Sequence, residues 1–150
     1  MGLAIEEAQK ACRLAEIPVG AVLVGSDGQI LGRAHNMPIS SNDPTAHAEI
    51  LAIREAAARI GNYRLPEAVV YVTLEPCAMC VGAMLHGRVK RLVFGARDPR
   101  GGAAGSVVDL TGIERFNHRM DVTEGVLGEK CAEILRRFFK ERREWNRSRK

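Results

Sequence analysis

Apolar residues recur near the amino terminus at intervals of three or four, as on one face of a helix. They are Ala4, Ala8, Ala11 and Ala15, with Ile5 and Cys12 beside them. This spacing predicts an amphipathic helix that ends before Pro18. Two apolar runs follow, Val19 to Val24 and Ile30 to Ala34, and the Asp27-Gly28 pair between them is typical of a tight hairpin turn. We therefore expect the first two strands to pair antiparallel.

Helical and strand patterns alternate through the middle of the chain. Asp43-Pro44 is typical of a helix start, with Asp43 as the cap and Pro44 in the first turn. We expect this helix to run to Ile60 and to stop at Gly61. Val69 to Thr73 is rich in β-branched residues, which favours a strand covered on both faces.

A second helix is expected to open at Glu75-Pro76 and to reach Gly87, and Arg91 to Phe94 forms the next strand. This strand, helix and strand predict a right-handed parallel crossover. A last short strand is expected near Asp121 to Val126. The final helix, 128–145, carries an apolar stripe. The pattern predicts an α/β domain with a central mixed sheet of about five strands flanked by helices.

Length and composition favour one domain spanning residues 1–150, because 150 residues with 46% hydrophobic composition can bury a core without disulfides. The first residues carry Glu6, Glu7 and Lys10 and therefore do not resemble a signal peptide. No stretch approaches the roughly 20 apolar residues that span a bilayer. We expect a cytoplasmic protein without membrane partners.

The positive charge is concentrated at the carboxyl end. Residues 1–135 hold 14 Lys and Arg against 16 Asp and Glu, whereas residues 136–150 hold 8 against 2. The body therefore carries a charge of −2 and the tail +6. Such a tail is either a solvated helix end or a contact for nucleic acid.

Cys77 and Cys80 are spaced to lie on one face of a helix, near its amino-terminal end. The helix dipole and free N–H groups there favour the thiolate, which is the form that binds zinc. His47 opens the preceding helix and supplies a third candidate ligand. Alternatively, His47 is an ordinary capping or core histidine and the cysteines are a redox pair or unreactive thiols.

Three protein ligands are typical of a catalytic zinc site, whereas a structural site fills all four positions from the protein. No candidate fourth ligand lies at a paired spacing, and this favours an open site. Glu49 lies two residues after His47, so helical periodicity alone would point it about 200° away. The candidates for a fourth ligand are Cys12, Cys131, His35, His86 and His118.

His47-Ala48-Glu49 followed by Pro76-Cys77-Ala78-Met79-Cys80 resembles the signature of the cytidine and deoxycytidylate deaminase superfamily. Further segments resemble the bacterial tRNA-specific adenosine deaminases. The resemblance implies a three-layer α/β/α, cytidine-deaminase-like fold. The segments are Ile17–Val22, Asp43–Glu49, Thr73–Cys77, Val93–Asp98, Gly102–Ser106, Asn117–Arg119 and Phe138–Phe139.

The resemblance implies hydrolytic deamination of adenosine to inosine at the wobble position of the tRNA anticodon. His47, Cys77 and Cys80 would hold one zinc ion per subunit, which activates a water molecule, and Glu49 would shuttle the proton. Substrate contacts are also implied, to the target base, to the flanking nucleotides and to phosphate, and so is a homodimer. Asn36 and the amide of Ala48 would contact the target base, and Arg97 and Asp98 the flanking nucleotides. Arg142 and Arg143 would contact phosphate, and Phe139 would stack or line the pocket.

Two questions about individual residues remain open. Asn36 could be a turn asparagine. Phe138 and Phe139 could both be core residues, or one of them could line the pocket.

Two other functions also stay open. The same zinc ligands and proton shuttle would serve a deaminase of a free base or nucleoside, such as cytosine or guanine. A non-catalytic, zinc-stabilised RNA-binding module is a second alternative, and in that protein Glu49 would be dispensable.

Overall fold

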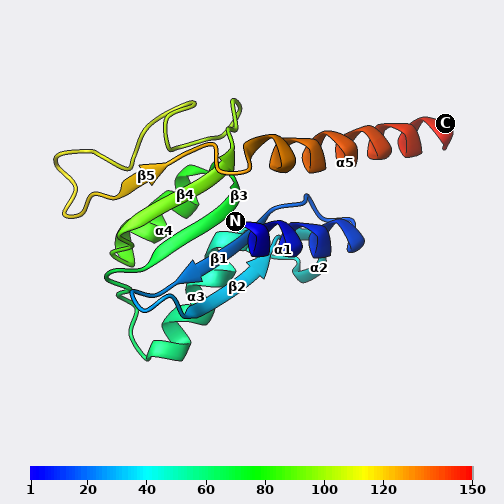
Figure 1. Cartoon of the computed structure of the whole chain (residues 1–150). Coiled ribbons are helices and arrows are strands. Elements are labelled where there is room, and N and C mark those ends of the chain that lie inside the picture. The colour runs from blue at the N-terminus through cyan, green and yellow to red at the C-terminus, as the bar shows by residue number, and fades with distance from the viewer. Residues whose placement is uncertain (150) are drawn as a thin grey trace.

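The computed structural model describes residues 1–149, which form a five-stranded sheet with helices on both faces (Figure 1). The strands lie in the order β2-β1-β3-β4-β5. Strand β1 pairs antiparallel with β2 and β3, whereas β3 with β4 and β4 with β5 are parallel. The expected mixed sheet is thereby confirmed. The strands are β1 (Gly20–Val24), β2 (Ile30–His35), β3 (Val69–Leu74), β4 (Arg91–Ala96) and β5 (Asp121–Thr123).

Helices cover both faces of the sheet and complete a three-layer α/β/α arrangement. Helices α1 (Gly2–Arg13) and α5 (Gly128–Ser148) pack on one face, and α3 (Ala48–Ile60) and α4 (Ala78–His86) pack on the other (Figure 1). The outer part of α5 extends past the sheet. Among the helices of residues 1–149, none combines the length and hydrophobicity needed to cross a bilayer.

The core lies mainly between the sheet and the α3–α4 layer. Its fully buried members range from small and β-branched side chains, such as Ala52, Val70 and Val72, to the larger Phe94. Gly32 of β2 allows α3 to approach very closely, because a Cβ atom at this position would lie 2.2 Å from the carbonyl oxygen of Ala52. This close packing fixes the position of α3, and hence of its first residues, relative to the sheet.

Two predicted details of the hairpin and the crossover are confirmed. Gly28 adopts the positive φ of 81° that the turn between β1 and β2 requires. Strands β3 and β4 are parallel and are connected through α4.

The predicted start of the helix that ends at Ile60 was wrong, because this helix, α3, begins at Ala48 rather than at Pro44. The carboxylate of Asp43 accepts hydrogen bonds from the N–H and the hydroxyl of Thr45, at 2.8 and 2.7 Å. It therefore stabilises a local turn instead of capping the helix. The residue at the N-cap is His47, whose backbone is extended.

Other boundaries differ from the prediction by a few residues. Helix α4 begins at Ala78, with Cys77 as its N-cap, so Pro76 lies outside it. Strand β5 ends at Thr123, because Gly125 turns the chain with a φ of 78°. A short helix that the pattern did not predict, α2 (Pro38–Ser41), follows β2.

Candidate active site

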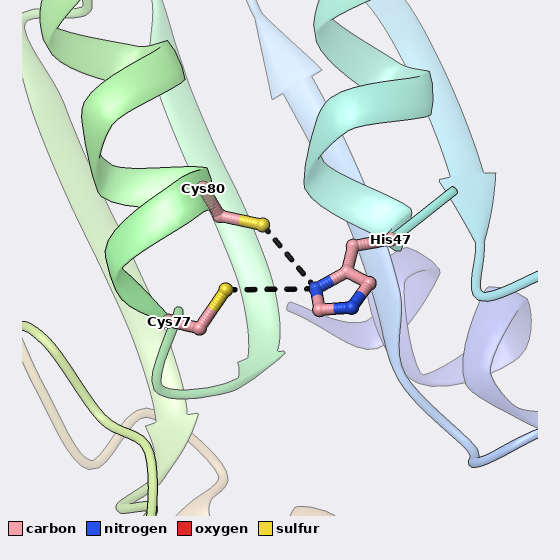
Figure 2. A group of neighbouring side chains, drawn as sticks. All are labelled: His47, Cys77 and Cys80. Atoms are coloured by element: carbon pink, nitrogen blue, oxygen red, sulfur yellow. Dashed lines mark hydrogen bonds between the residues drawn. The ribbon is translucent and has the colours of Figure 1, made fainter. Parts of the chain in front are cut away.

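The three predicted zinc ligands come together where α3 and α4 begin. His47 is the N-cap of α3 and Cys77 the N-cap of α4, while Cys80 lies in the first turn of α4. The Nδ1 atom of His47 lies 3.6 Å from Sγ of Cys77 and 3.5 Å from Sγ of Cys80 (Figure 2). Residues 30 or more positions apart in the chain thus offer their donor atoms to one point.

The spacing of these atoms fits a tetrahedral zinc ion. With Zn–S and Zn–N bonds of about 2.3 and 2.0 Å, a sulfur and a nitrogen ligand are about 3.6 Å apart. Both nitrogen–sulfur distances match this value within about 0.1 Å. The ligand atoms all lie within 4.8 Å of one another, so the residues present could hold the ion without rearrangement.

A fourth side-chain ligand does not join this group within residues 1–149. His35 bonds Glu7 on the α1 side of the sheet, at 3.0 Å from Nδ1. His118 lies 2.6 Å from the carbonyl oxygen of Val89. Three donors with one open position are the pattern of a catalytic zinc site. The other candidates, Cys12, Cys131 and His86, also lie outside the group.

Glu49 is buried beside the three ligands, with only 3% of its surface exposed. Its Oε2 atom makes no hydrogen bond within the described residues. Burial raises the pKa of this carboxyl from 4.5 to about 7, and the nearby His47 opposes the rise. A buried carboxyl that titrates near neutrality is suited to accept and release protons.

Helical periodicity did not predict that Glu49 and His47 lie close together, but in the structure both line one pocket. The reason is that His47 precedes the helix, with φ −73° and ψ 152°, so the relation between two positions of one helix does not apply to the pair.

The two thiols affect each other's ionisation. The hydrogen bond with Cys80 and a further one with His47 lower the pKa of Cys77 from 9.0 to about 4, although burial opposes this. The same bond and burial raise the pKa of Cys80. The hydrogen bond with Cys77 raises the pKa of His47. One thiolate therefore forms readily here, and thiolate is the form that ligates zinc.

A pocket of about 250 Å³ opens onto His47, Glu49 and Cys77. Complete small-molecule sites usually measure about 300–1,000 Å³, so this volume suits a single ring system. Asn36 lines the pocket and is nearly buried. Its Oδ1 accepts a hydrogen bond of 2.9 Å from the N–H of Ala48, which leaves its NH₂ group as a donor. The other lining residues are Glu16, Ile17, Val19, Pro38, Ile39, Leu74, Glu75 and Asp98.

Several of these lining residues were not predicted as site residues. Ile17 and Leu74 lie in segments that carried the family resemblance, which is the signal that could have identified them. Pro38 and Ile39 belong to the unpredicted helix α2, and Ile39 is exposed at the pocket rim.

Of the predicted substrate contacts, Asn36 and Asp98 line this pocket, whereas the five others, among them Ala48, do not. Arg97 pairs with Glu124 at 2.5 Å. Phe139 and Arg143 are exposed on α5.

Arg142 instead contacts the body of the protein. Its Nη1 donates to the carbonyl oxygen of Ala15 at 3.5 Å, and its guanidinium lies 5.8 Å from the ring centroid of Phe138. Phe138 itself is buried and belongs to the packing of α5, and its ring meets that of Phe139 edge to face.

The fold and the His-Cys-Cys group are those of the deaminases with a cytidine-deaminase-like fold. A solved structure from work on A-to-I editing by tRNA:A34 deaminases at the wobble position of transfer RNA matches with a TM-score of 0.86 and 47% identity. That match covers 90% of this chain and 97% of the other. A guanine deaminase from Nitrosomonas europaea matches with a TM-score of 0.76 and 25% identity, over 91% of this chain and 81% of the other.

The family model described as MafB19-like deaminase matches residues 1–143. The tRNA-specific adenosine deaminase of Haemophilus influenzae is 54% identical over 96% of this chain and 83% of its own length. The Bacillus subtilis protein of the same name is 50% identical over 93% and 86%. The chain therefore belongs to the MafB19-like deaminases, and within them to the family of the tRNA-specific adenosine deaminases.

Proposed function

We propose that this protein hydrolytically deaminates adenosine to inosine at the wobble position of tRNA anticodons. The observation that carries the proposal is the buried carboxylate of Glu49, whose Oε2 atom has no hydrogen-bond partner, beside three donor atoms at zinc-ligand spacing. The names of the relatives that share most of the chain support the choice of substrate.

The residues of the pocket divide the chemistry between them. A zinc ion held by His47, Cys77 and Cys80 would lower the pKa of a water molecule to about 7. Glu49 accepts a proton from water and passes it to the ring nitrogen beside the carbon that carries the amino group. It then takes the remaining proton of the added hydroxyl group and delivers it to the amine, so that the C–N bond breaks, ammonia leaves and adenine becomes hypoxanthine. Because Glu49 is desolvated, its carboxyl can both take and release this proton near neutral pH.

Asn36 orients the target base. The N–H of Ala48 engages its Oδ1 atom, so the NH₂ end faces the pocket as a donor for an acceptor atom of the base. We therefore assign Ala48 an indirect role, because its amide holds Asn36 and is not free to meet the base.

The anticodon loop offers an unpaired base, which lowers the cost of extruding the target from a stack by a few kcal/mol. Asp98 at the pocket rim and Arg97 next to it would meet the flanking nucleotides. On α5, Arg143 and Phe139 are exposed and available to RNA, by phosphate contact and by stacking respectively. The guanidinium of Arg142 already packs on the ring of Phe138, so we propose for Arg142 only a secondary contact with RNA.

The decisive experiment uses an anticodon stem-loop with a wobble adenosine and detects inosine by mass. Glu49→Gln should retain zinc and lose about 10²- to 10⁴-fold in turnover, because it cannot move a proton. Glu55→Gln, on the exposed side of the same helix, is the matched control and should behave as the wild type. Unchanged function in Glu49→Gln would instead favour the non-catalytic RNA-binding module.

A free-base deaminase is the second candidate, and the similarity to the guanine deaminase of Nitrosomonas europaea favours it. A free-base deaminase would need no basic surface for RNA, whereas residues 136–150 of this chain carry a net charge of +6. Turnover of guanine or cytosine in the absence of RNA, with no inosine in the stem-loop, would select this candidate.

We also propose that the single domain 1–150 forms a homodimer with one zinc ion per subunit and works in the cytoplasm, where tRNA is present. Light scattering coupled to size-exclusion chromatography measures the assembly, and metal analysis measures the ratio of zinc to protein. A monomer that deaminates the stem-loop would contradict the proposed dimer but not the proposed deamination.

A further inference from the structure

Two buried carboxylates, Glu16 and Glu75, line the pocket without belonging to the zinc group. Glu16 is 1% exposed, and its Oε1 accepts hydrogen bonds from the N–H and the hydroxyl of Ser40, at 2.6 and 2.8 Å. Ser40 lies in the first turn of α2, where N–H groups have no partner within the helix. The N-cap residue Met37 provides no side-chain cap. Glu16 therefore caps α2 from 24 residues away in the chain.

Glu75 holds a different segment, the loop 98–106. Its carboxylate accepts the N–H groups of Asp98, Ala104 and Ser106 at 3.0, 3.1 and 2.9 Å, and also the hydroxyl of Ser106. The loop wraps the carboxylate so closely that a Cβ atom on Gly102 would lie 2.3 Å from its carboxyl carbon.

Both tethered segments contribute the rim of the pocket. Helix α2 supplies Pro38 and Ile39, and the loop supplies Asp98. Helix α2 follows β2 and the loop follows β4, and these strands are separated in the sheet by β1 and β3. The two segments therefore reach the pocket from different sides, each fixed by one buried carboxylate.

We propose that Glu16 and Glu75 are positioning residues that set the width of the pocket rim and thereby its selectivity for the nucleotides beside the target base. Their bonds to the protein all go to rim segments, and neither joins the zinc group. Each carboxylate accepts two or more hydrogen bonds from its segment, and together these bonds restrict the segment more than a single bond would. This inference rests on the proposed function for the identity of the substrate.

The test uses small changes that remove one donor from each tether, Ser40→Ala and Ser106→Ala. Values of kcat and KM are measured for the cognate stem-loop and for stem-loops altered at the nucleotides next to the wobble adenosine. We expect the ratio of kcat/KM between cognate and altered loops to fall roughly tenfold, mainly through KM. Zinc content should not change. Ser41→Ala is the matched control, because its hydroxyl donates to the Met37 carbonyl instead, at 2.6 Å.

A double-mutant cycle of Glu16→Gln with Ser40→Ala tests the tether itself. The two changes should affect the selectivity ratio less than additively, because they remove the same contact. Additive effects would overturn the proposal. So would an equal loss on all stem-loops accompanied by a lower melting temperature, which is the result expected of a merely structural role.

The wild type serves as the reference for the proposed function. Inosine in the cognate stem-loop supports that function whatever the variants do. If the wild type acts on free bases instead, the same variants are compared for their ratio of guanine to cytosine turnover. An unchanged ratio there would overturn the rim proposal separately.

Discussion

Glu7 joins α1 to β2 through a buried carboxylate surrounded by cationic and imidazole nitrogens. Its oxygens lie 2.7 Å from Nζ of Lys10, 2.7 Å from Nε of Arg33 and 3.0 Å from Nδ1 of His35. Burial by itself raises the pKa of Glu7, but these hydrogen bonds outweigh burial and lower the pKa from 4.5 to about 2. The ionised carboxylate is therefore favoured by the fold.

The contribution to stability follows from this difference. A pKa that is lower in the folded than in the unfolded state means that the unfolded chain binds the proton more tightly. The stabilisation is complete above pH 4.5 and is lost as the pH falls through about 2. At about 1.4 kcal/mol per pH unit, the ionised Glu7 contributes about 3 kcal/mol to the free energy of unfolding.

Glu7→Gln keeps the shape of the side chain and removes its charge. Urea denaturation followed by circular dichroism should show a loss of about 3 kcal/mol at pH 7, and this loss should shrink steadily between about pH 5 and 2. Titrating groups that do not contact Glu7 are common to both proteins and cancel in the difference. Glu6→Gln is the control, since the Glu6 side chain is 61% exposed and its pair with Arg33 is 3.5 Å long. If the difference in unfolding free energy between Glu7→Gln and the wild type does not depend on pH, the reasoning is refuted.

Four further substitutions separate the roles of other residues. Cys80→Ser should abolish zinc binding and deamination together, as measured by metal analysis and inosine formation. Arg143→Ala should reduce the salt slope of stem-loop binding by about 1, measured by fluorescence anisotropy, whereas Arg142→Ala should mainly lower the melting temperature; equal slopes for both would contradict this division. Gly32→Ala should cost about 1–3 kcal/mol in urea denaturation, because its Cβ would meet the Ala52 carbonyl, and an unchanged stability would show that α3 moves away freely.

The order and type of the elements followed from local patterns. The apolar stripe of α1 reflects one buried helix face, and the β-branched run of β3 reflects a strand whose residues are buried or half-buried. Burial of this kind is encoded by neighbours in the chain. The cysteine spacing likewise predicted that Cys77 and Cys80 would present their sulfurs together, since both lie in one turn.

The element boundaries were harder to predict, because short-range hydrogen bonds compete there. Asp43 has the chemistry of a helix cap, but its carboxylate accepts hydrogen bonds from Thr45 instead. The helix therefore starts at Ala48, four residues later than Pro44. Helix α2 has four residues and no periodicity, and its cap is the distant Glu16. No local pattern in the sequence could predict a capping residue that lies 24 residues away in the chain.

By itself, the sequence determined which chemical groups are available, namely one imidazole, two thiols and a carboxylate at family-like spacings. Tertiary structure decided that His47 of α3 meets the cysteines of the neighbouring α4, that Glu49 is buried with its Oε2 atom unpaired, and that Arg142 contacts Ala15 and Phe138. The physical reason is one of range. Spacing along the chain governs contacts within one helix turn, whereas burial and the approach of α3 to α4 depend on how helices pack on a common sheet.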